Sequence, residues 1–80
     1  MVSRFLGQYV KSLAYHGEVR RFKVRGRFAI VECRDGTISL LYVESRGGLI
    51  QYSEIREIKF NSLEDLKDLY GVLGDWLERE

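Results

Sequence analysis

Apolar residues recur with a helical period at both ends of the chain. Between residues 3 and 15 they lie three and four positions apart, which predicts an amphipathic helix that ends near Gly17. Residues 62–79 repeat the pattern and predict a second amphipathic helix, capped by Asn61 or Ser62. The apolar stripe of this second helix consists of Leu63, Leu66, Leu69, Tyr70, Leu73, Trp76 and Leu77.

The apolar period changes to two between these helices. Asp35-Gly36 joins two alternating runs and predicts a hairpin with a two-residue turn. That turn gives one apolar face, formed by the pairs Cys33 with Ile38, Val31 with Leu40, and Ala29 with Tyr42. We therefore expect one α+β domain, residues 1–80. It contains an N-terminal helix, about four antiparallel strands in a meander, and a C-terminal helix, with both helices on one face of the sheet.

The segment 20–28, RRFKVRGRF, carries five positive charges interleaved with apolar residues. If Arg25-Gly26 forms the turn before the next strand, Arg21 and Lys23 lie on the face opposite the helices, beside Phe28 and Ile30. A third turn near residues 46–48 leaves open whether Tyr52 faces this open side or the core. The pattern predicts a surface on which positive charge and apolar area alternate.

The overall charge of +1 hides a strong asymmetry. Residues 1–34 hold eight Lys and Arg against two Glu, a net charge of +6, whereas residues 61–80 carry −4. Such asymmetry indicates an anionic partner. The chain has no apolar run long enough for a membrane span and no signal peptide pattern, so we expect a cytoplasmic protein that binds no membrane. Because 80 residues bury only a small core, a homo-oligomer is expected as well.

Little in the sequence indicates catalysis. His16 is the single histidine and follows the first helix, while Cys33 falls on the expected core face. Glu64, Asp65 and Asp68 match the positive end of the second helix dipole. No nucleotide-binding glycine motif and no metal-ligand spacing is present. We expect a protein that is not an enzyme and that uses no metal and no cofactor.

Cations and aromatic residues on adjacent strands favour a single-stranded nucleic acid as the ligand, because phosphates and unstacked bases require both. A duplex is disfavoured because the acidic last helix would be repelled from a major groove. We expect a sequence-tolerant single-stranded DNA-binding protein, although the pattern does not distinguish DNA from RNA. The candidate contact residues are Arg20, Arg21, Phe22, Lys23, Arg25, Arg27, Phe28, Arg34 and Tyr52.

Two alternatives stay open. The cations of an ordinary solvated strand can guard a sheet edge and bind nothing. The chain can also be a small protein–protein interaction module or a self-assembling adaptor with no nucleic-acid ligand. In that case the acidic last helix docks on a partner, or on the basic strands of a neighbouring copy.

Two stretches resemble the positive-cofactor-four family of single-stranded DNA-binding proteins. RGRFAIVECR (25–34) is similar to its basic strand, and residues 58–77 are similar to its last strand and C-terminal helix. The resemblance implies DNA binding, with Arg25, Arg27 and Arg34 at the basic positions of the motif and Gly26 in the turn.

The order of a helix, an antiparallel sheet and a second helix in a proline-free chain resembles the archaeal ThermoDBP-related proteins more closely. This resemblance implies an archaeal, thermophilic, oligomeric protein that holds the bases of single-stranded DNA in an apolar cleft. Tyr9, Phe22 or Tyr52 would line such a cleft.

Overall fold

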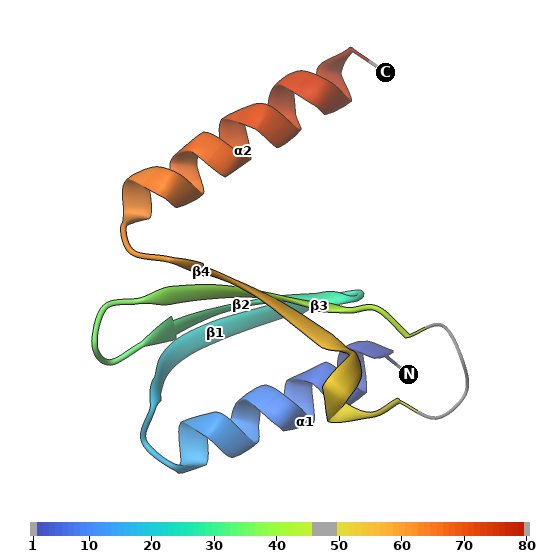
Figure 1. The fold of residues 1–80 in the computed structure, drawn as a ribbon, viewed down its shortest axis with the longest axis vertical. Helices are drawn as coiled ribbons and strands as arrows, with labels where there is room; N and C mark the ends of the chain where they lie inside the picture. The colour runs from blue at the N-terminus through green and yellow to red at the C-terminus, as the bar shows by residue number, and fades with distance from the viewer. Residues whose placement is uncertain (1, 46–49, 80) are drawn as a thin grey trace.

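The computed structural model describes residues 2–45 and 50–79 (Figure 1). In chain order the elements are α1 (Val2–Tyr15), β1 (Val19–Arg25), β2 (Phe28–Cys33), β3 (Ile38–Val43), η1 (Tyr52–Glu54), β4 (Ile55–Phe60) and α2 (Leu63–Glu78). The strands form one antiparallel sheet in the order β1-β2-β3-β4. The expected α+β architecture of a helix, a four-stranded meander and a helix is confirmed.

One face of the sheet packs against α1. Leu6 and Val10 lie one helical turn apart and are fully buried, because they meet inward-facing side chains from three strands. These strand residues are Val19, Ala29, Val31, Leu41 and Val43. The helix ends at Tyr15, and Gly17 reverses the chain just beyond it, with a left-handed φ of 81° and an N–H that donates to the Ala14 carbonyl at 2.9 Å. The chain thus turns directly from α1 into β1, which keeps the helix against the sheet.

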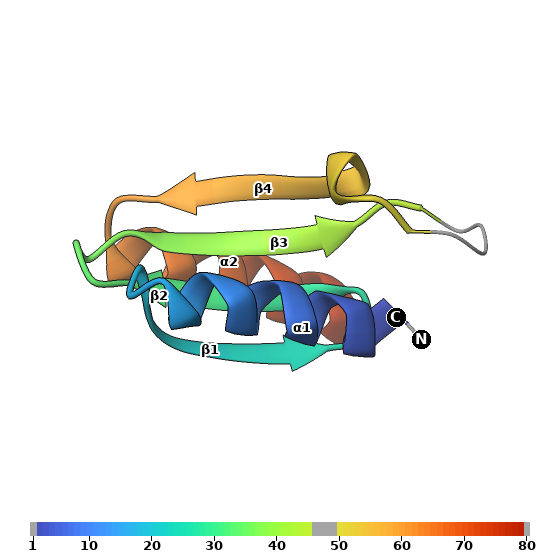
Figure 2. The ribbon, with the colours of Figure 1, turned by 90° about the horizontal axis from the view of Figure 1, so that it is seen from below.

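The second helix lies on the other face, so the expectation that both helices cover one face is wrong (Figure 2). Phe60, the last residue of β4, pairs with Ile38 on this second face, and the chain continues to the same side. Ile30 and Leu40 also face this side and alternate with the side chains under α1. Both faces of the central strands are therefore apolar, and α1 covers only one of them.

The hairpin between β2 and β3 differs by one residue from the expected register. The Cys33 N–H donates to the Thr37 carbonyl at 2.9 Å, where Ile38 was expected as the partner. The loop holds three residues because Gly36 adopts a left-handed φ of 93°, as a turn followed by a bulge requires. As a result the β3 side chains on the face of α1 are Ser39, Leu41 and Val43, while those on the second face are Ile38, Leu40 and Tyr42.

The turn between β1 and β2 lies one residue later than expected. Gly26, at φ 58°, and Arg27 form the two-residue turn, so that Arg25 pairs directly with Phe28. The register changes by two residues, and a change of two leaves each side chain on its expected face. The cations of β1 therefore keep the orientation that the sequence predicts.

Candidate functional site

Three cations of β1 lie in a row on the second face of the sheet. Arg21, Lys23 and Arg25 are all exposed, and β1 is an edge strand. Lys23 pairs with Ile30, and Arg25 pairs with Phe28. Residues opposite each other in a sheet share a face, so a row of positive charge runs beside a row of apolar side chains.

One of these cations already has an anionic partner. The Arg21 Nε donates to Glu32 Oε1 at 2.5 Å, and the Arg21 side chain remains 80% exposed. An ion pair at the surface contributes less than about 1 kcal/mol to stability, and here water solvates the Arg21 guanidinium well, whereas the Glu32 side chain is 25% exposed. The Arg21 guanidinium can therefore exchange the carboxylate for a phosphate at small cost.

Phe28 presents an aromatic ring next to this row. Its ring stacks on Tyr42 with 4.9 Å between the centroids and 30° between the planes. About half of Phe28 is nevertheless exposed (49%). A ring that is supported on one side and open on the other can accept a second planar group by stacking.

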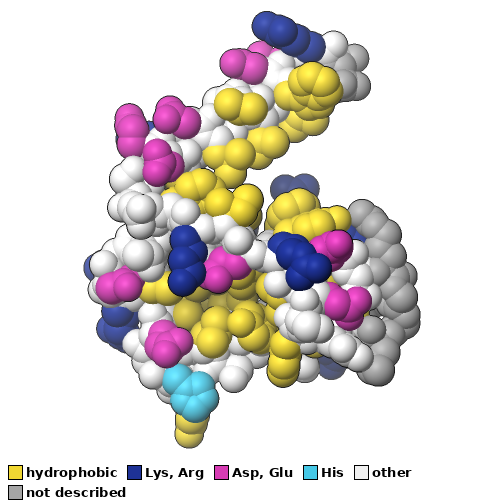
Figure 3. Space-filling model, viewed as in Figure 1, with side chains coloured by type: hydrophobic (Ala, Val, Ile, Leu, Met, Phe, Trp, Pro, Cys, Tyr) yellow, Lys and Arg dark blue, Asp and Glu magenta, His cyan; other side chains and the backbone are white. Residues whose placement is uncertain are grey.

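The second face and α2 together form an apolar groove of about 750 Å³. The sheet supplies its floor and α2 overhangs it, as Figure 3 shows with hydrophobic side chains on both walls. Carboxylates gather on the outward side of α2 in the same view. The lining residues are Phe28, Ile30, Leu40, Leu63, Leu66, Lys67, Leu69, Tyr70 and Leu73.

The cations of β1 lie at one side of this groove. Arg21 and Lys23 line a smaller adjoining hollow of about 350 Å³ together with Ile30, Leu63 and Leu66. Ile30, Leu63 and Leu66 belong to both hollows, so the apolar groove opens toward the positive charge. This geometry suits a ligand that is anionic along one edge and apolar along the other.

Arg27 lies elsewhere and has a structural partner. Its Nη1 donates to the Val43 carbonyl at 2.9 Å and also to the Ser45 carbonyl. The side chain is half-buried. The guanidinium therefore ties the β1–β2 turn to the end of β3, and Arg27 stands apart from the row of cations.

Tyr52 lies on the side of α1, far from the groove in the fold. Its ring contacts those of Phe5 and Tyr9 on α1, with centroid distances of 5.6 and 5.3 Å. Ile50 packs against the core beside it. The third turn expected at 46–48 lies outside the described residues.

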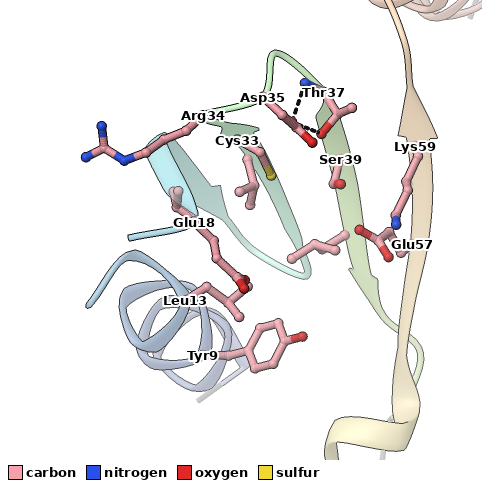
Figure 4. A pocket seen from close by; sticks show the side chains of 13 residues that line it. Tyr9, Leu13, Glu18, Cys33, Arg34, Asp35, Thr37, Ser39, Glu57 and Lys59 are labelled. Atoms are coloured by element: carbon pink, nitrogen blue, oxygen red, sulfur yellow. Dashed lines mark hydrogen bonds between the residues drawn. The ribbon is translucent and has the colours of Figure 1, made fainter. Parts of the chain in front are cut away.

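The three remaining candidates are exposed but separate from the groove. Arg20 occupies the position at which the pairing of β1 with β2 shifts register. Phe22 pairs with Val31 on the face of α1, is 36% exposed at the sheet edge, and also lines the smaller hollow beside Arg21 and Lys23. Arg34 lies in the loop between β2 and β3, and its side chain points away from the other labelled residues in Figure 4. The structure thus brings together Arg21, Lys23, Arg25 and Phe28 on the second face, with Phe22 at the edge of the smaller hollow.

Another hollow, separate from the groove and from its adjoining hollow, has a volume of about 540 Å³. It opens on the face of α1, where the sheet extends past the helix (Figure 4). Charges of both signs line it, from Glu18, Asp35 and Glu57 and from Arg34 and Lys59, so it offers no row of one sign. Within it the Asp35 carboxylate accepts hydrogen bonds from the Thr37 N–H at 3.0 Å and from the Thr37 hydroxyl at 2.7 Å. The N–H bond is the main reason why the pKa of Asp35 lies below its ordinary value of 3.8.

Sequence reasoning missed most of the groove. Leu40 was expected under the helices, and the stripe of α2 was expected to be buried with α1. The error has two sources, because the β2–β3 register and the side taken by α2 together decide which apolar residues line the groove. The only sequence signal was the continuous apolar character of Ile38-Ser39-Leu40-Leu41-Tyr42, in which both alternating sets are largely hydrophobic.

Over the described ranges, 2–45 and 50–79, no group of three or more His, Cys, Asp or Glu side chains is arranged to hold a metal ion. Neither described helix is long and apolar enough to cross a membrane. Comparisons of the chain with protein-family models, with curated proteins and with solved structures find no significant match.

Proposed function

We propose that this protein binds single-stranded DNA and catalyses no reaction. The observation that supports the proposal best is the row of Arg21, Lys23 and Arg25 beside an open apolar groove. Positive charge neutralises phosphates, and apolar and aromatic side chains accept unstacked bases. A single strand offers both groups at once.

In this proposal the DNA backbone follows β1. Alternate residues of a strand repeat about every 7 Å, so the three cations form a regular row along the sheet edge. The strand Val19–Arg25 contains four Lys and Arg and no acidic residue, and its neighbour Glu32 is paired with Arg21. Each phosphate contact contributes roughly 0.7 to the slope of log affinity against log salt.

The bases turn away from β1 and enter the groove. Phe28 offers the open side of its ring, and one stacked base gains about 1–3 kcal/mol. Behind it, the groove walls are leucine, isoleucine and aromatic side chains, with Lys67 as the one charged residue. Such walls supply few hydrogen-bond donors for reading base edges, which favours tolerance of sequence.

A duplex fits this site poorly. Its bases are already stacked on one another, so they have no free face to offer Phe28. Glu64, Asp68 and Asp75 are exposed and, by their helical spacing, lie on the side of α2 opposite the groove, and their charges repel the second phosphate backbone. We therefore expect selectivity for the single strand.

The test is fluorescence anisotropy with a labelled oligo-dT, the matching duplex and an oligo-rU, each at several salt concentrations. We expect tight binding of oligo-dT, weak binding of the duplex, and affinity that falls steeply with salt. Absence of oligo-dT binding at low salt, or equal binding of the duplex, would contradict the proposal. Equal binding of oligo-rU would extend the ligand class to RNA.

A further inference from the structure

The second half of α2 projects away from its own sheet and exposes a distal stripe, which comprises Tyr70, Leu73, Trp76 and Leu77 (Figure 1). These four side chains are 79, 50, 66 and 66% exposed, respectively. Leu66, in the first half of the helix, is half-buried instead. The distal stripe is therefore a large apolar surface without a partner in the single chain.

The spacing along α2 is that of a helix–helix seam. Leu63, Leu66, Tyr70, Leu73 and Leu77 follow one another at intervals of three, four, three and four residues. This is the a and d pattern of a coiled coil, in which each apolar side chain inserts between side chains of a like helix. An unpaired seam of this kind is complementary to a second copy of itself.

We propose that the distal stripe binds the distal stripe of a second copy, so that two antiparallel α2 helices join two chains into a dimer. The four side chains, with Leu63 and Ile58 beside the groove, expose on the order of 700 Å² of largely apolar surface. Specific interfaces bury about 600–1,000 Å² on each partner, and the available area lies in the lower part of this range. The contact is isologous and closes after two copies.

The helix dipoles select the antiparallel orientation. Both halves of α2 carry acidic groups outside the seam, Glu64, Asp65 and Asp68 in the first half and Asp75 and Glu78 in the second, so these charges do not distinguish the two orientations. An antiparallel pair sets the positive start of each helix beside the negative end of the other, whereas a parallel pair brings like ends together.

This dimer shares Tyr70 and Leu73 with the lining of the groove, but it shares no residue with the row of cations on β1. It uses the end of α2 that lies farthest from β1, and it leaves Arg21, Lys23 and Arg25 uncovered. Its failure would leave the proposed function standing, and the converse also holds.

The first test is the molar mass in solution, measured by light scattering over a range of protein and salt concentrations. We expect twice the chain mass of 9.4 kDa, also at high salt, because an apolar seam between acidic helices is not held by opposite charges. The double variant Leu73→Glu/Leu77→Glu should have the mass of one chain. Its matched control, Gly71→Glu/Val72→Glu, adds the same charges outside the seam and should remain a dimer.

Three results would overturn the proposal: a single-chain mass for the unaltered protein, a dimer that survives in Leu73→Glu/Leu77→Glu, or a dimer that dissociates as salt rises. The last result would indicate that acidic α2 docks on the cations of β1 instead. Circular dichroism checks that each variant folds. If the double variant does not fold, Trp76→Gln serves in its place, because a side chain 66% exposed in the single chain contributes little to its folding.

The orientation has its own test. A spin label at Glu64→Cys in a Cys33→Ser background should lie about 28 Å along the axis from its counterpart in an antiparallel pair, because Glu64 precedes the centre of the distal stripe by nine to ten residues and each residue advances the helix by about 1.5 Å. If the distance between the two labels equals only the width of two adjacent helices, the dimer is parallel and the proposed arrangement is wrong.

Discussion

Lys23 of β1 and Ile30 of β2 lie directly opposite each other on the face of the sheet that α2 overhangs. One side chain carries an ammonium group at the edge, and the other forms part of the apolar floor. The same relation holds between Arg25 and Phe28. The proposed binding of phosphates and bases by neighbouring strands depends on this alternation.

The Phe28 ring is expected to carry much of the base contact. Phe28→Ala should weaken oligo-dT binding about tenfold or more, since one lost stack costs about 1–3 kcal/mol. The salt slope should not change, because no phosphate contact is removed. The comparison is Phe22→Ala, which truncates a ring on the other face of β1 that reaches only the edge of the smaller hollow, so a smaller loss of affinity is expected. A larger effect of Phe22→Ala in the anisotropy measurement would place the bases on the side of α1.

Arg27 is expected to stabilise the fold and to leave DNA binding unaffected. Arg27→Gln removes the guanidinium that bonds the Val43 and Ser45 carbonyls, and should lower the free energy of unfolding by about 1–3 kcal/mol. Arg25 is exposed, so Arg25→Gln should show the opposite pattern. Its free energy of unfolding should stay within about 0.5 kcal/mol of that of the unaltered protein, and its slope of log affinity against log salt should be smaller. Urea denaturation and anisotropy on both variants separate the two roles. A reduced salt slope for Arg27→Gln would contradict this assignment.

Two glycine substitutions should change stability in opposite directions. Gly36→Ala should destabilise the protein by about 1–2 kcal/mol, because its φ of 93° is strained for any residue with a Cβ. Gly7→Ala should stabilise it by up to about 1 kcal/mol, since the position is helical and no atom lies within 4 Å of the added carbon. Urea denaturation compares both with the unaltered chain. A stabilising Gly36→Ala would contradict the three-residue loop.

The β2–β3 loop should also respond to pH. The pKa of Asp35 lies below 3.8 because the Thr37 N–H, and then its hydroxyl, hydrogen-bond the carboxylate. The resulting stabilisation is therefore present above pH 3.8 and is lost as the pH falls through the lowered pKa. Thr37→Val removes only the hydroxyl and should raise the pKa part of the way back. An NMR titration measures the pKa of Asp35 in the unaltered protein and in Thr37→Val. An unchanged pKa in the variant would refute the role of the hydroxyl.

Local patterns predicted the elements of this fold because each pattern repeats within one element. The helical period identified α1 and α2, and alternation identified β1 with its cations on one side. Ser62 caps α2 as expected, accepting from the Asp65 N–H at 3.4 Å. These features depend on neighbouring residues alone.

Features that depend on a loop were harder to predict. Asp35-Gly36 is compatible with a two-residue turn and with a three-residue loop that ends in a left-handed glycine, and the choice shifts every β3 side chain to the other face. The side taken by α2 depends on the short connection after Phe60, the last residue of β4. Two of the predicted site residues also lie apart from the groove, for a tertiary reason: Arg27 hydrogen-bonds two backbone carbonyls, and the Tyr52 ring packs against rings of α1. The spacing of residues along the sequence does not reveal such contacts.

The measurement that tests the central claim most directly is the salt dependence of oligo-dT affinity for two triple variants. Arg21→Ala/Lys23→Ala/Arg25→Ala removes the cationic row, and Arg4→Ala/Lys11→Ala/Lys59→Ala removes three exposed charges elsewhere. The account predicts that the first variant binds far more weakly, with a slope reduced by about 2, while the second binds nearly as the unaltered protein does. Equal slopes and affinities for the two folded variants would contradict binding along β1.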